Sequence, residues 1–123
     1  MQISATPKTP LVQFDFEAKF LLLKGVSCPD NPLQFFTPIF ENLKEYLKSN
    51  TELSIEMQLD YFNTGSSKCI LNLFQMITDA LEDKQNIKVK WLTDEGDSEL
   101  REAGKIFQEM SGLDFTFLNN EEL

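Results

Sequence analysis

Two hydrophobic periods follow one another along the chain, and their order predicts a fold that mixes strands and helices. Apolar and polar residues alternate with a period of two over residues 11–17, 53–61 and 87–91, the pattern of strands that bury one face. Residues 19–26 form a more continuously apolar run, and residues 114–118 form a last short strand. Because so short an interval separates residues 11–17 from residues 19–26, this pair is expected to form an antiparallel hairpin.

The alternation also predicts which strand side chains face the core. In the first strand the inward set is Val12, Phe14 and Phe16. The strand over residues 53–61 carries the clearest signal in the chain, and its inward set is Leu53, Ile55, Met57, Leu59 and Tyr61. These two sets define the expected sheet side of the core.

Three segments have the three- and four-residue spacing of amphipathic helices. The apolar stripe of the first, within residues 33–50, consists of Leu33, Phe36, Phe40, Leu43 and Leu47. The stripe of the second consists of Ile70, Phe74, Ile77 and Leu81, and that of the third of Leu100, Ala103, Phe107 and Met110. Pro38 allows the first helix to start instead with Thr37 as its N-cap, and both starts leave the same apolar face.

The resulting order, β-β-α-β-α-β-α-β, predicts parallel neighbouring strands joined by right-handed helical crossovers. Strands covered on both faces would be apolar throughout, whereas Glu56, Gln58, Lys88 and Lys90 occupy the second face here. The helices are therefore expected mainly on one face. The prediction is a single two-layer α/β domain, residues 1–123, with a mixed sheet of about five strands and residues 1–10 as a loose lead-in.

Charge and composition narrow the function classes. Acidic residues outnumber basic ones 20 to 11, for a net charge of −9, and Lys and Arg form no cluster, which argues against binding of nucleic acid or of a membrane surface. Histidine is absent, and Cys28 and Cys69 lack the paired spacing of a zinc site, so no metal or other cofactor is expected. Without a signal peptide or membrane-spanning run, we expect a cytoplasmic protein with reduced thiols.

The most informative segment joins the strand over residues 53–61 to the second helix. It reads Tyr61-Phe-Asn-Thr-Gly-Ser-Ser-Lys68 and offers three hydroxyl groups, on Thr64, Ser66 and Ser67. Capping of the helix is sufficient to explain Ser, Thr and Asn at such a position. The segment lacks the glycine and lysine order of a phosphate-cradling nucleotide loop, so nucleotide binding is not expected.

This junction resembles that of STAS domains, the fold of bacterial anti-sigma-factor antagonists, and most closely the SiaC-like regulatory phosphoproteins. Two flanking segments carry the same resemblance. Gly25-Val-Ser-Cys-Pro-Asp-Asn31 is similar to the family turn Gly-x-Ser-x-Pro-Glu-Asn, and residues 94–107 are similar to its acidic loop leading into Glu-x-Gly-x-x-Phe. The chain departs from the family pattern at Asp30, where Glu is usual, and at Gly65, where Ser is common.

The resemblance implies a non-catalytic partner-switching protein whose phosphoacceptor is Thr64. A Ser/Thr kinase would phosphorylate it, a metal-dependent phosphatase would reverse this, and the unphosphorylated form would bind an effector. In the best-understood systems of the resembling family this effector is a diguanylate cyclase of cyclic di-GMP and biofilm signalling. The switch loop would comprise Asn63, Gly65, Ser66 and Ser67. Possible partner-binding residues are Tyr61, Asp30, Asn31 and Asp94.

Two other readings of the chain stay open. One is a small α/β enzyme with Thr64 or Cys69 as nucleophile, which the absence of histidine disfavours. The other is a structural adaptor that is never modified. An acidic loop with Asp94, Glu95, Asp97 and Glu99 fits no calcium-binding pattern, and it is expected to cap the third helix through Asp97 or Ser98.

Overall fold

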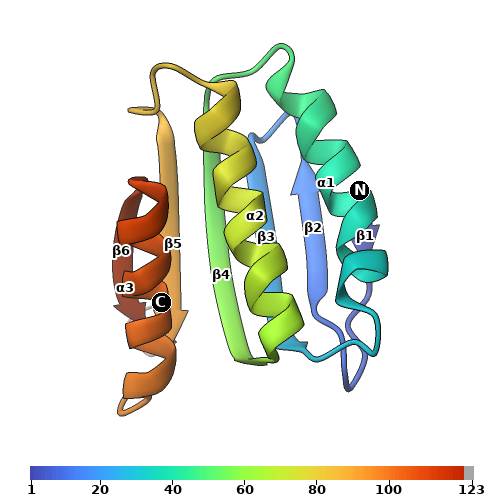
Figure 1. Cartoon of the computed structure of the whole chain (residues 1–123), viewed down its shortest axis with the longest axis vertical. Coiled ribbons are helices and arrows are strands. Elements are labelled where there is room, and N and C mark those ends of the chain that lie inside the picture. The colour runs from blue at the N-terminus through green and yellow to red at the C-terminus, as the bar shows by residue number, and fades with distance from the viewer. Residues whose placement is uncertain (121–123) are drawn as a thin grey trace.

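All three helices lie on one face of a single six-stranded sheet in the computed structural model, which describes residues 1–120 (Figure 1). The strands are β1 (Gln2–Ile3), β2 (Leu11–Asp15), β3 (Phe20–Ser27), β4 (Leu53–Phe62), β5 (Ile87–Thr93) and β6 (Asp114–Asn119). The helices are α1 (Pro32–Leu47), α2 (Thr64–Ala80) and α3 (Ser98–Ser111). No helix in this described range is long and apolar enough to cross a membrane.

The strands lie in the sheet in the order in which they occur in the chain. The predicted hairpin of β2 and β3 is confirmed as antiparallel, whereas β3, β4, β5 and β6 run parallel to one another. Since each helix follows a parallel strand, all three begin at the carboxyl edge of the sheet, the lower edge in Figure 1. The predicted mixed sheet with helices on one face is confirmed.

Within the expected lead-in, Gln2 and Ile3 form a strand, which raises the number of strands from about five to six. β1 pairs antiparallel with β2, with Ile3 opposite Val12. The amino group of Met1 also donates a hydrogen bond to the Phe14 carbonyl at 3.0 Å. Backbone pairing to an open sheet edge thus orders a segment that has little apolar surface of its own.

Helix α1 starts earlier than Thr37, and its buried stripe is rotated. Asn31 is the N-cap, its side chain accepting a hydrogen bond from the Gln34 backbone amide at 3.1 Å, and Pro32 occupies the first turn. The Thr37 hydroxyl instead donates to the Leu33 carbonyl within the helix. The fully buried side chains are Phe36, Ile39, Leu43 and Tyr46. Leu33, expected in the stripe, is 61% exposed.

A bulge at the end of β4 reverses the expected direction of Tyr61. Gly25 of β3 lies opposite Leu59, but Val26 lies opposite Tyr61, so β4 carries one extra residue at this point. Beyond the bulge Phe62 takes the core position, packing against Trp91 and Phe107, and Tyr61 is 54% exposed. The prediction that Tyr61 faces the core is therefore wrong, while Leu53, Ile55, Met57 and Leu59 are buried as predicted.

Two further apolar side chains were expected in the core and are exposed instead. Phe16 lies one residue beyond the end of β2 and is 37% exposed, although its ring is still close to those of Phe14 and Tyr46. Met110 is 57% exposed because α3 covers only the β5–β6 side of the sheet and buries a narrow strip around Phe107. The expected inward residues Val12 and Phe14 are buried.

Trp91 fixes the position of α3. Its indole is 2% exposed, and Nε1 donates to the Leu100 carbonyl at 2.9 Å. Gly104 faces the ring so closely that a Cβ atom there would lie 2.6 Å from the indole. The glycine is thus required by a close approach between helix and ring.

Gly104→Ala should destabilise the fold, although alanine is the better helix former by about 1 kcal/mol. Overpacking against the fixed indole is expected to lower the free energy of unfolding by about 1–3 kcal/mol, measured by urea denaturation. Glu102→Ala, an exposed site in the same helix, is the control and should change it by less than about 0.5 kcal/mol. Equal stability of Gly104→Ala and the wild type would contradict the tight contact.

Candidate functional site

The junction between β4 and α2 is held by Asn63, which is the N-cap of the helix. Its side-chain oxygen accepts from the Ser66 backbone amide at 2.8 Å, and its own backbone amide donates to the Ser27 carbonyl at 3.0 Å. The amide group of Asn63 also donates to the Pro29 carbonyl at 3.4 Å. The predicted switch loop is therefore attached to the turn that precedes α1, and the cap of α2 is Asn63.

Thr64 occupies the first helical position and its side chain is exposed. Among the described residues its hydroxyl group has no hydrogen-bond partner. No side chain in residues 1–120 is hydrogen-bonded to it as a general base would be. The hydroxyl is accessible to another protein and is chemically unactivated within this chain.

The other two hydroxyl groups of the junction are in different environments. Ser66 is fully buried, and its Oγ atom accepts a hydrogen bond from the Ser27 hydroxyl at 2.8 Å. Ser67 is half-buried, and its backbone amide donates to the Asn63 carbonyl. Of the three, only Thr64 presents an exposed side chain to solvent.

Gly65 lies where the beginnings of α1 and α2 come closest. A Cβ atom at this position would lie 2.6 Å from Cγ of Pro32 and 3.3 Å from its Cβ. A serine, common in the resembling family, would have to displace the proline ring. Glycine at position 65, where the resembling family commonly has serine, thus allows Pro32 to pack closely against the predicted switch loop.

The turn before α1 contributes structural as well as exposed groups. Asn31 caps α1, and Ser27 supplies the buried hydroxyl described above. Asp30 is 95% exposed and makes a loose ion pair of 3.6 Å with Lys8, which contributes little to stability. Asp30 is therefore free to meet a partner, whereas Asn31 is committed to the helix start.

Asp94 lies at the same sheet edge, directly after β5, but no hydrogen bond or ion pair in residues 1–120 joins it to the predicted switch loop. Its carboxylate accepts from the Asn120 side chain at 2.7 Å, and its carbonyl accepts from the Asp97 amide. Of the two predicted caps of α3, Asp97 and Ser98, the cap is Asp97, which accepts from the Leu100 amide at 3.2 Å. Within residues 1–120 no group of three or more acidic or thiol side chains is placed to hold a metal ion.

Two exposed apolar side chains belong to the elements that meet at Thr64. Tyr61 precedes it by three residues and Leu33 follows the Pro32 that packs on Gly65. The sequence pattern assigned both to the core. Only the bulge in β4 and the rotation of α1, which depend on contacts far apart in the chain, bring them to the surface.

Neither cysteine is placed as a nucleophile. Cys69 is buried in α2, and burial raises the pKa of its thiol, which keeps it protonated at neutral pH. Cys28 is a half-buried free thiol within 3.7 Å of the Asn63 side-chain nitrogen. The raised pKa of the Cys69 thiol argues against the enzyme with a Cys69 nucleophile that the sequence left open.

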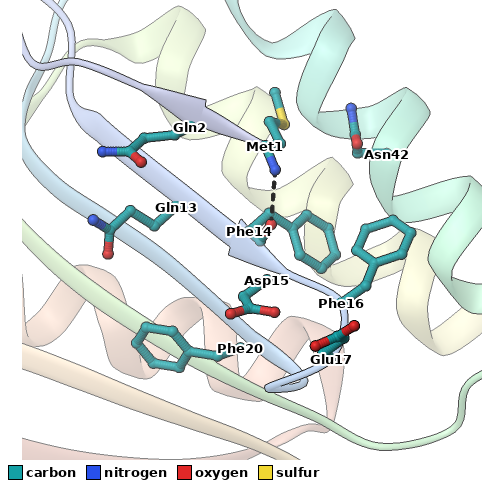
Figure 2. A pocket seen from close by; sticks show the side chains of 9 residues that line it. All are labelled: Met1, Gln2, Gln13, Phe14, Asp15, Phe16, Glu17, Phe20 and Asn42. Atoms are coloured by element: carbon teal, nitrogen blue, oxygen red, sulfur yellow. Dashed lines mark hydrogen bonds between the residues drawn. The ribbon is translucent and has the colours of Figure 1, made fainter.

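A hollow in the described surface lies elsewhere, at the opposite edge of the sheet. It has a volume of about 660 Å³ and is lined by the ends of β1 and β2 and by the following turn (Figure 2). Asp15 and Glu17 extend into it beside Phe16 and Phe20. No hydroxyl or thiol lines this hollow, and it is not continuous with the junction at Thr64.

Comparison with known proteins identifies the relatives of this chain. A model of the SiaC family of regulatory phosphoproteins matches residues 3–120. An uncharacterised protein of Pseudomonas aeruginosa is 24% identical over 123 residues, covering 99% of this chain and 98% of its own.

Solved structures give the same result for the fold. A chain in the crystal structure of the diguanylate cyclase SiaD in complex with its activator SiaC, from P. aeruginosa, superposes with a TM-score of 0.90 at 23% identity. That match covers 98% of this chain and 99% of the other. Apo-SiaC from the same organism superposes with a TM-score of 0.87 at 24% identity, covering 96% and 97%.

Ser66→Ala should destabilise the protein more than the neighbouring Ser67→Ala. The first change leaves the Ser27 hydroxyl buried without its partner and is expected to cost about 1–3 kcal/mol of unfolding free energy. The second removes a half-buried hydroxyl and should cost less than about 0.5 kcal/mol. In urea denaturation the Ser27→Ala/Ser66→Ala double variant should lose less than the sum of the single variants; strict additivity would show that the two hydroxyls are not coupled.

Proposed function

Because the chain belongs to the SiaC family of regulatory phosphoproteins, we propose that it is a non-catalytic signalling protein whose switch is the phosphorylation of Thr64. The exposed hydroxyl at the first position of α2 is the observation that carries the proposal. It projects from the first turn of α2, where Asn63 and Ser66 on either side are both fixed by hydrogen bonds. A kinase would meet one accessible hydroxyl on a rigid surface.

A phosphate on Thr64 would act on partners more than on the fold. It adds a charge of about −1.5 to −2 and three acceptor oxygens. The N-terminus of a helix carries a partial positive charge, so negative charge at the first position stabilises it. A partner packed on Tyr61 or Leu33 would instead face an added, hydrated anion. The modification can therefore release an effector while the protein stays folded.

Three partners follow from this proposal. A Ser/Thr kinase adds the phosphate, a phosphatase removes it, and an effector binds the unmodified form. The solved complex of SiaC with the diguanylate cyclase SiaD supports a diguanylate cyclase as the effector here too. Asp30 and Asp94, which lie at the same sheet edge as Thr64, are proposed to help orient the partner. We also propose a cytoplasmic location. Cys28 and Cys69 are free thiols, and the reducing cytoplasm would keep them in this state.

The phosphate should be found on Thr64 alone. Incubation with the cognate kinase and ATP is expected to add one phosphate, and peptide mapping should place it on Thr64, since Ser66 is buried and Ser67 half-buried. Thr64→Ala should abolish the mass increase while Ser67→Ala leaves it unchanged. A phosphate mapped to Ser66 or Ser67 of the wild type would contradict Thr64 as the phosphoacceptor and would assign the switch to that serine.

The charge at position 64 should control binding of the effector. Thr64→Ala is expected to fold normally, within about 0.5 kcal/mol of the wild type, because Asn63 and not Thr64 caps the helix. Its affinity for the effector, measured by calorimetry, should match that of the wild type, whereas Thr64→Glu should bind at least several-fold more weakly. Equal affinities of these two variants would contradict a charge-based switch.

A further inference from the structure

The charges of α2 are arranged against the dipole of the helix. Its charged residues are Lys68, near the N-terminus, and Asp79, near the C-terminus, and neither its first turn nor its last holds the charge that would stabilise it. Lys68 is the fifth residue of the helix and lies beyond the first turn, where the helix dipole acts on side-chain charges. The dipole of the unmodified helix therefore gives no reason for a positive charge at this position.

Lys68 is exposed, and no carboxylate in residues 1–120 forms an ion pair with it. The residues three and four positions away along the helix, namely Thr64, Gly65, Leu71 and Asn72, include no acid. Five of the ten lysines in residues 1–120, namely Lys8, Lys19, Lys48, Lys88 and Lys105, pair with a carboxylate, and Lys68 is among the five that do not. The ammonium group of Lys68 is thus an unneutralised charge beside the switch residue.

Thr64 and Lys68 are four residues apart on the same face of α2. Side chains at this spacing have Cβ atoms about 5–6 Å apart, and helical side chains lean toward the N-terminus of the helix. The stem of Lys68 therefore leans over the turn that carries Thr64. An anion placed N-terminal to a cation at this spacing is the favourable order of the two charges.

Resting on the proposed function, we infer that Lys68 is the internal counter-ion of the phosphate on Thr64. Phosphorylation then does two things at one surface. It adds an anion beside Tyr61, and it withdraws a free ammonium group that the unmodified protein offers to a partner. Lys68 would thereby be a positioning residue, because its ammonium group holds the phosphate against the surface of α2.

A titration of the phosphate tests this pairing without any partner protein. Phosphothreonine is installed at position 64 of the full chain by genetic-code expansion, and the second ionisation of the phosphate is followed by ³¹P NMR. Lys68→Gln should raise the pKa of the phosphate by about 0.3 units, the shift expected for an exposed pair at this spacing. Lys68→Arg should restore the wild-type value. High salt should shrink the difference between wild type and Lys68→Gln.

Lys90→Gln is the matched control, because Lys90 is an exposed lysine in β5 without an ion-pair partner in the described chain. It removes the same charge away from α2 and should leave the phosphate pKa unchanged. The same pKa in Lys68→Gln, Lys90→Gln and the wild type would overturn the pairing and assign the phosphate to solvent or to helix amides. Failure of a kinase to modify Thr64 would instead overturn the proposed function, since the installed phosphate still reports on Lys68.

Discussion

The site depends on one packing constraint, the attachment of the α2 N-terminus to the turn that precedes α1. Four contacts make this attachment: the buried hydrogen bond between Ser27 and Ser66, the two hydrogen bonds that Asn63 donates to the carbonyls of Ser27 and Pro29, and the close approach of Pro32 to Gly65. Thr64 lies between Asn63 and Gly65. Because Asn63 and Ser66 are fixed in place, the side chain of Thr64 is directed outward. The exposure of Thr64 is a consequence of what its neighbours bury.

The same attachment leaves Thr64 without a role in the stability of the fold, so the proposed modification of Thr64 interrupts no structural contact. Capping is provided by Asn63, and the buried hydroxyl pair belongs to Ser66, so Thr64 has no structural task that a modification would interrupt. An anion at the first helical position is also electrostatically favourable. The proposed phosphorylation of Thr64 would therefore change what the surface binds while the sheet and its helices remain as they are.

Much of the architecture could be predicted from hydrophobic periodicity, because strands β2 to β6 and the three helices each bury a regular stripe. The features that periodicity missed depend on contacts between distant segments. The bulge opposite Gly25 turns Tyr61 outward, and edge pairing with β2 orders Gln2 and Ile3. Neither the bulge nor the edge pairing can be predicted from the local sequence. The choice among Asn63, Thr64 and the serines as cap was equally open, since all are good caps.

The central claim is that phosphorylation of Thr64 changes one surface of a fold that otherwise stays the same. Amide ¹H–¹⁵N spectra of the unmodified and phosphorylated protein test this most directly. The account predicts shift changes confined to residues 61–68 and to the adjoining turn at residues 27–33, with the amides of β5 and β6 unmoved. Changes spread through the sheet, or none near Thr64, would contradict it.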